Sequence, residues 1–144
     1  MKALSVRNPY AAFILIGEKP VECRSWQTDY RGDLLICSSA NPKVKNTICG
    51  HAICVVRLDH IEPFTKEHLE AACLDEMPEG NNYAWHITNL RMIKPFPVKG
   101  KLGLFEVDDS QIEVLIDGDK DLSEEEAQAF YNKYIAPYLY TGNK

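Results

Sequence analysis

The stretch GEKPVECRSW, residues 17–26, places a lysine, a glutamate, an arginine and a tryptophan directly after an apolar run. That run has the pattern of a short helix, in which Asn8 is the N-cap and Pro9 occupies the first turn. Gly17 then supplies a left-handed terminator. The stretch therefore predicts the point where a helix ends and a strand begins.

The second half of this stretch, Val21 to Trp26, has the composition of a strand. Alternate positions of a strand face the same way, so its charged and aromatic side chains line one surface. A turn at residues 29–33 follows, and a basic residue lies on either side of the strand. We expect five side chains to converge at one end of the domain: Lys19, Glu22, Arg24, Trp26 and Arg31.

The rest of the chain predicts more strands than helices. Further strand patterns cover residues 34–38, 50–64, 83–93, 102–107 and 112–116. Helices are expected at 66–74, after Thr65, and from the capping box at Ser123 to about residue 134. Pro95 and Pro97 cannot donate to a ladder, so we place them at an edge or a crossing. Because most strands follow one another through turns, we expect an antiparallel, barrel-like α+β domain.

Length and charge limit the class of protein. A chain of 144 residues fits one domain, 1–144, and its 45% hydrophobic composition is that of a globular protein. The apolar run from Tyr10 to Ile16 is too short to cross a membrane, and the N-terminus lacks a signal-peptide pattern, so we expect a cytoplasmic protein. A net charge of −5 disfavours non-specific coating of DNA or RNA.

The sequence gives little support for a metal or a cofactor. Its five cysteines form no CxxC pair. Cys49 and His51 would share one face of a strand while Cys54 takes the other, so no metal site is expected there. The glycine-rich nucleotide motifs, GxSxG and HExxH are also absent, and we expect no cofactor.

The side chains at 19–31 suit a nucleobase or a nucleotide. A carboxylate accepts from an exocyclic amine, arginine reads a planar edge or pairs with phosphate, and tryptophan offers a stacking face. The alternative is a purely structural ion pair of Glu22 with Arg24 or Arg31, covered by Trp26. The residues alone leave both interpretations open.

Several separated segments resemble the ASCH domain (activating signal cointegrator homology), a family of the PUA-like superfamily. These segments are Ala3 to Tyr10, the GxKxxExRxW pattern of 17–26, Arg31 to Ile36, Tyr83 to Ile87 and Pro95 to Phe105. The resemblance covers about residues 3–107 and leaves 108–144 as a C-terminal extension. It implies a PUA-like small β-barrel with flanking helices, and RNA or a nucleotide-like small molecule as the partner.

The resemblance also raises enzyme activity, because some small relatives are amidohydrolases acting on N4-acetylcytidine and others are described as ribonucleases. Lys19 and Glu22 would then be the catalytic candidates. Those amidohydrolases carry a threonine three residues after the lysine, where this chain has Glu22. A neighbouring carboxylate favours a charged lysine and opposes its use as a base, so the pair could simply bind a ligand.

Three further features complete the set of candidates. Ser38 is a nearby hydroxyl, and His86 is the histidine we expect closest to the ligand, although Trp85 and His86 point to opposite faces. The aromatic stripe of the C-terminal helix is expected to pack on the barrel. A protein-interaction adaptor using that helix is the third class of function, distinct from a binding module and an enzyme.

Overall fold

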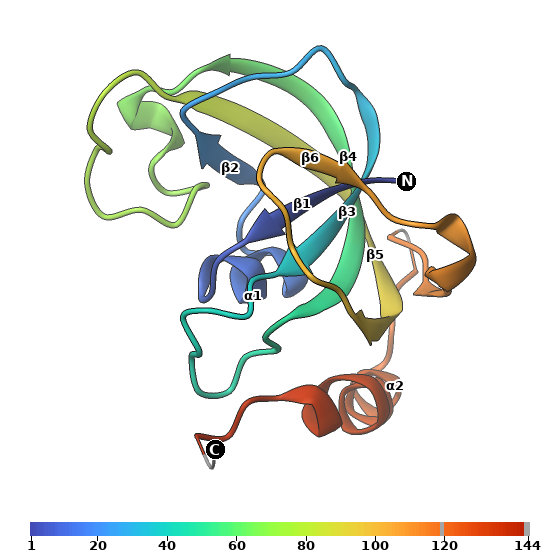
Figure 1. Cartoon of the computed structure of the whole chain (residues 1–144). Coiled ribbons are helices and arrows are strands. Elements are labelled where there is room, and N and C mark those ends of the chain that lie inside the picture. The colour runs from blue at the N-terminus through green and yellow to red at the C-terminus, as the bar shows by residue number, and fades with distance from the viewer. Residues whose placement is uncertain (119, 143–144) are drawn as a thin grey trace.

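A computed structural model describes residues 1–118 and 120–142 of the chain. Its centre is a curled sheet that forms a half-barrel, with short helices around it (Figure 1). The strand order is β2-β5-β4-β3-β1-β6, and β7 pairs with β5 outside this path. The strands are β1 (Lys2–Val6), β2 (Val21–Arg24), β3 (Gly32–Ser38), β4 (His51–Pro63), β5 (Tyr83–Pro97), β6 (Leu104–Glu106) and β7 (Val114–Ile116).

The sheet is mixed rather than fully antiparallel. β1, which the sequence analysis did not predict, pairs in parallel with β3 and antiparallel with β6. The chain between β1 and β3 contains both a helix and β2, which is long enough to return in the same direction. The α+β, PUA-like barrel class is confirmed, and the expectation of purely antiparallel pairing is wrong at this one contact.

The core lies on both faces of the inner strand β3. Leu34 and Ile36 pack in the main cluster with Trp85, whereas Leu35 and Cys37 pack in a second cluster on the other face. All of these side chains are essentially inaccessible to solvent. The continuous apolar run therefore marks a central strand, as the sequence analysis predicted.

The first helix is shorter than predicted. α1 spans Tyr10–Leu15, and Gly17 has a φ of +81°, the left-handed conformation expected at a helix end. Asn8 does not cap this helix. Its side chain is buried and donates to the carbonyl oxygen of Ile48 at 2.9 Å, which ties the start of α1 to the loop before β4.

The later helices also differ in length from the predictions. The helix predicted at 66–74 is a single 3₁₀ turn, η1 (Lys66–His68), followed by turns. A second 3₁₀ turn, η2, spans Asp109–Gln111. α2 (Glu124–Phe130) begins with the predicted capping box, in which Ser123 and Glu126 exchange hydrogen bonds. It continues as a π-helical turn, η3 (Tyr131–Ile135), and a 3₁₀ turn, η4 (Ala136–Tyr138).

The C-terminal segment packs on the half-barrel through its last part. Ile135, Tyr138 and Leu139 contact the main core cluster, and the Tyr138 ring meets the His51 ring edge-on at 5.6 Å. Tyr131 is 44% exposed. The C-terminal aromatic stripe therefore packs on the main core through Tyr138, while Tyr131 stays largely exposed.

Two prolines of β5 lie where the strand pairing does not need their missing N–H groups. Pro95 falls within an irregularity of the β4–β5 register, between the pairs Cys54–Met92 and Ala52–Phe96, where no ladder donor is needed. Pro97 ends the strand opposite His51.

Within the described part of the chain, no helix has the length and apolar character needed to span a membrane.

Candidate functional site

A cavity of about 420 Å³ opens between β1, the start of α1, β2 and the loop before β5. The predicted residues Lys19, Glu22, Arg24 and Trp26 all line it. Strand alternation explains this, because Glu22 and Arg24 are two residues apart in β2 and share a face. Trp26 follows in a bend that continues along the same wall.

Three charged side chains form a linked network in this cavity. One oxygen of the Glu22 carboxylate lies 3.4 Å from Nζ of Lys19, and the other accepts from Nε of Arg24 at 2.7 Å. Lys19 also donates to the carbonyl oxygen of Ala72 at 2.6 Å. The side chains of Lys19 and Glu22 are only 2% and 8% exposed, so this network is shielded from water.

Arg24 is the member of the network that reaches the open cavity. Its Nη2 donates to the carbonyl oxygen of Ser5 at 2.8 Å, which anchors the guanidinium to β1. Nη1 meets no acceptor within the described residues, and the side chain is 23% exposed. The group therefore offers a free donor edge to a ligand.

Aromatic rings hold the walls of the cavity. Trp26 packs edge-on against the buried Trp85 with ring centroids 4.8 Å apart, and Nε1 of Trp85 donates to the carbonyl oxygen of Trp26. Nζ of Lys19 lies 5.2 Å from the ring centre of Tyr10. Contacts within the protein itself therefore hold Trp26 and Lys19 in position before any ligand binds.

A second lobe of about 590 Å³ adjoins the first. The two lobes share Ser5, Arg7, Arg24 and Trp26, so together they form one groove. The loop between β5 and β6 supplies the far wall of the second lobe, including the exposed Lys99 and Lys101. Hereafter "the groove" means these two lobes.

The groove is basic although the chain is acidic. Among the described residues, five basic side chains and one carboxylate, that of Glu22, line it. The whole chain carries a net charge of −5. The basic set is Arg7, Lys19, Arg24, Lys99 and Lys101.

The structure places three predicted site residues outside the groove. Arg31 is exposed and donates to the carbonyl oxygens of Thr28 and Tyr30 in its own turn. Ser38 is buried, and its hydroxyl pairs with the backbone of His51 across β3 and β4. His86 lies on the opposite face of the sheet from Trp85, as expected, and this orientation turns it away from the groove.

Several groove residues carry no functional signal of their own in the sequence. Arg7, Lys99 and Lys101 are the basic ones, and Tyr10 and Asn82 are polar. Arg7 and the lysines lie in segments 3–10 and 95–105, which carried the family resemblance. That resemblance was a usable signal, but only the fold shows that these segments meet β2 at one groove.

The cysteine-histidine set considered for a metal does not form a site. Cys54 is fully buried in the core, and burial raises the pKa of its thiol. His51 instead contacts the carbonyl oxygen of Cys49 through Nδ1 at 2.9 Å. A different set of possible ligands, His60, Glu62 and His86, lies close together on the face that His86 occupies.

Comparisons with known proteins agree with this fold. The family model of the ASCH domain matches residues 4–97, about two thirds of the chain, and the chain therefore belongs to the ASCH domain family. No match was found among curated proteins.

Solved structures are similar to this chain over nearly its whole length. The crystal structure of ASCH from Zymomonas mobilis is similar with a TM-score of 0.57 at 16% identity, covering 92% of this chain and 94% of that chain. A mutant of the Zymomonas mobilis protein in which phenylalanine replaces a tyrosine has a TM-score of 0.53 at 15% identity, with 92% and 96% covered. A second mutant, in which alanine replaces a serine, gives 0.54 at 15% identity, with 91% and 94% covered. At these identities the likeness shows the fold alone.

Proposed function

We propose that this ASCH domain binds single-stranded RNA or a nucleotide in the groove. Domains of the family commonly bind RNA. The observation that carries the proposal is the local charge: five basic side chains against one carboxylate line the groove of a protein whose net charge is −5. A basic site on an acidic body attracts an anion locally while the rest of the surface repels a long polyanion.

The two lobes suit different parts of a nucleotide. The inner lobe has a volume within the range of small-molecule sites and combines Trp26 with the free donor edge of Arg24. A tryptophan face stacks on a base, and a guanidinium edge binds a base edge or phosphate. The outer lobe places Lys99 and Lys101 beside Arg7, which suits a phosphate backbone.

In this proposal, the main role of Glu22 is to hold Lys19 and Arg24 in position. Both of its oxygens are engaged, one by Lys19 and one by Arg24, and this orients the two cations. A contact between Glu22 and a base edge stays a prediction. It requires that one carboxylate oxygen keeps a lone pair that Lys19 and Arg24 do not use.

The alternative functions have weaker support. Lys19 donates to a carbonyl oxygen and pairs with Glu22, so its contacts are those of a fixed cation rather than of a general base. Hydrolysis of an amide on a modified cytidine, or of an RNA phosphodiester, remains the second candidate because this pair lines a cavity of suitable size. For an adaptor, the large exposed apolar side chains described here belong to five separate segments rather than one helix: Ile16, Met77, Leu102, Val114 and Tyr131.

The experiment is a fluorescence-anisotropy titration of a labelled single-stranded RNA of about ten nucleotides, with unlabelled nucleotides as competitors. The test variant, Arg7→Gln/Lys101→Gln, removes two exposed cations of the groove that make no hydrogen bond or ion pair among residues 1–118 and 120–142. The matched control, Arg57→Gln/Lys94→Gln, removes the same charge from exposed positions outside both lobes.

The proposal expects RNA to bind the wild type and the control alike and the test variant about tenfold or more weakly. Equal loss in both double variants would show that binding follows net charge and would refute the groove as the site. Chromatography of the same mixtures decides the enzyme question, because a product made by the wild type and lost in Lys19→Met would establish hydrolysis.

A further inference from the structure

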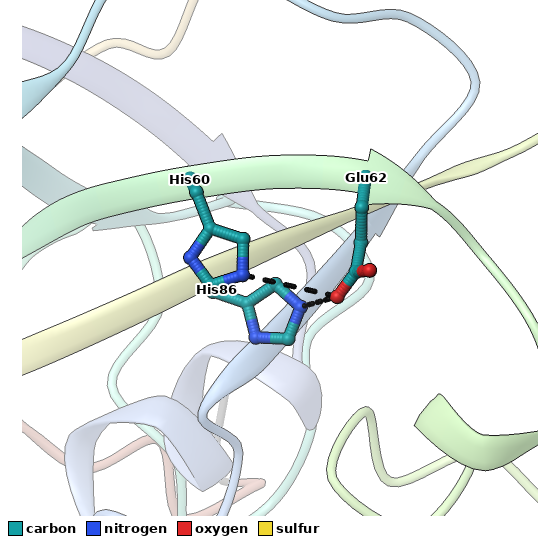
Figure 2. Close-up of side chains that lie close together, drawn as sticks. All are labelled: His60, Glu62 and His86. Atoms are coloured by element: carbon teal, nitrogen blue, oxygen red, sulfur yellow. Dashed lines mark hydrogen bonds and ion pairs between the residues drawn. The ribbon is translucent and has the colours of Figure 1, made fainter.

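Three histidines and a glutamate gather on the face of the sheet opposite the groove. His60 and Glu62 are two residues apart in β4 and therefore share a face. His86 of β5 is the direct cross-strand partner of His60. Figure 2 shows the rings of His60 and His86 side by side, both with a nitrogen turned toward the same oxygen of Glu62.

One carboxylate oxygen is the centre of this cluster. Oε2 of Glu62 lies 2.6 Å from Nε2 of His86, 3.1 Å from Nε2 of His68 and 3.8 Å from Nε2 of His60. The rings of His60 and His86 stack with their centroids 4.0 Å apart. Three of these residues, His60, Glu62 and His86, each offer a ligand atom within 4.8 Å of the others.

Hydrogen bonds assign different roles to two of the three histidines, His68 and His60. Nδ1 of His68 accepts from the backbone N–H of Thr65 at 2.9 Å, so its proton is on Nε2 and points at Glu62. His68 is therefore a donor to the carboxylate. Nδ1 of His60 faces a carboxylate oxygen of Asp59 at 2.8 Å, which holds the proton on Nδ1 and leaves the lone pair on Nε2 directed at the cluster.

We propose that His60, His86 and Glu62 bind a zinc ion, with His68 and Asp59 as the supporting outer shell. Two imidazoles and one carboxylate are a ligand set that zinc uses, and a water molecule would complete the tetrahedron. Ligands about 2.0–2.1 Å from zinc lie about 3.3 Å apart. The His60–Glu62 distance of 3.8 Å must shorten slightly, and the His86–Glu62 distance of 2.6 Å must lengthen as a cation replaces the shared proton.

The surroundings favour a transition-metal cation over calcium or magnesium. Imidazole nitrogens suit zinc and its neighbours, whereas calcium and magnesium require mainly oxygen ligands. The Asp59–His60 contact matches the carboxylate–histidine pairs that orient metal ligands.

This site is independent of the proposed RNA groove. His86 pairs with Val21 of β2, whereas the groove residue Glu22 pairs with Trp85, so the two sites lie on opposite faces of the same strands. Neighbouring positions in the sequence give no signal for this metal site. The ligands come from two paired strands, β4 and β5, in which the cross-strand partners His60 and His86 lie more than twenty residues apart in the sequence.

The test uses the full chain, stripped of metal with a chelator and titrated with zinc by calorimetry. Cobalt is titrated in parallel, because tetrahedral cobalt gives visible absorption bands that report the ligand geometry. The ligand variants are His60→Ala and Glu62→Gln, both at side chains about half exposed and so expected to fold. Glu67→Gln removes an exposed carboxylate of η1 that contributes no ligand to this cluster, and it is the matched control for Glu62→Gln.

We expect one zinc per chain, with affinity lower by about 100-fold in each ligand variant and unchanged in Glu67→Gln. Asp59→Asn should lose about tenfold, the usual effect of removing an outer-shell partner. Absence of zinc binding in the wild type, or equal affinity in wild type and His60→Ala with unchanged circular dichroism, would overturn the proposal. The second result would show that His60 is not a ligand of the metal.

Discussion

The network of Lys19, Glu22 and Arg24 makes a quantitative prediction about stability. Glu22→Gln keeps the shape of the side chain but removes the carboxylate that compensates Lys19, whose side chain is only 2% exposed. Leaving a buried charge uncompensated costs about 3–5 kcal/mol of unfolding free energy. Arg24 adds less to this loss, because it is 23% exposed and keeps its bond to the carbonyl oxygen of Ser5.

Lys19→Met should be milder than Glu22→Gln. Glu22 keeps Arg24 as a partner at 2.7 Å, and the main loss is the donor to the carbonyl oxygen of Ala72, worth about 1–3 kcal/mol. The double variant should therefore be more stable than Glu22→Gln alone, because the second change removes the uncompensated cation. Urea denaturation of the four proteins, followed by circular dichroism, gives the free energies of this cycle.

Two results would refute this reasoning. A cost below about 1 kcal/mol for Glu22→Gln would mean that water compensates Lys19 and that the network is not buried in solution. Additive effects of the two substitutions would mean that the two side chains do not interact. The control is Glu67→Gln, an exposed carboxylate for which we expect a change within about 0.5 kcal/mol.

Three other predictions follow from single contacts. The hydrogen bond from Arg91 lowers the pKa of Asp33, so this bond stabilises the fold above about pH 4, and the stabilisation is lost as the pH falls through the lowered pKa. Asp33→Asn should therefore lower the free energy of unfolding by at most about 1 kcal/mol at pH 7. In urea titrations at acid pH, the stability difference between this variant and the wild type should vanish. Burial raises the pKa of Cys37 to about 12 and also raises that of Cys54, so mass spectrometry after alkylation of the native protein at pH 8 should show neither modified, and rapid labelling of either would contradict the packing. Trp26→Ala should weaken RNA binding by about 1–3 kcal/mol in anisotropy titrations if a base stacks there, and unchanged affinity would remove stacking from the account.

The local patterns predicted the parts of the fold that depend on neighbouring residues. The left-handed Gly17, the capping box at Ser123 and the central β3 follow from short-range rules and are confirmed. Asn8 failed as a predicted cap because a tertiary contact with Ile48 takes its side chain. The helix predicted after Thr65 shortened to one turn, since helix propensity is a weak force that tertiary context overrides.

The site was predictable where its residues lie on one strand and unpredictable where they come from several. Alternation along β2 placed Glu22 and Arg24 together, and both line the groove. Arg31, only seven residues after Arg24, turns back onto its own loop, which no periodicity could show. Lys99 reaches the same groove from a distant loop, and only the parallel and antiparallel pairing of β1 brings these segments together.

The salt dependence of RNA binding tests the central claim most directly. For single strands, the slope of log K against log salt concentration is about −0.7 per phosphate neutralised. If the groove binds the RNA backbone, the slope of Arg7→Gln/Lys101→Gln should be shallower than that of the wild type by about 1.4, while Arg57→Gln/Lys94→Gln keeps the wild-type slope. The same slope in all three proteins would contradict the account, because the groove cations would then make no contact with phosphate.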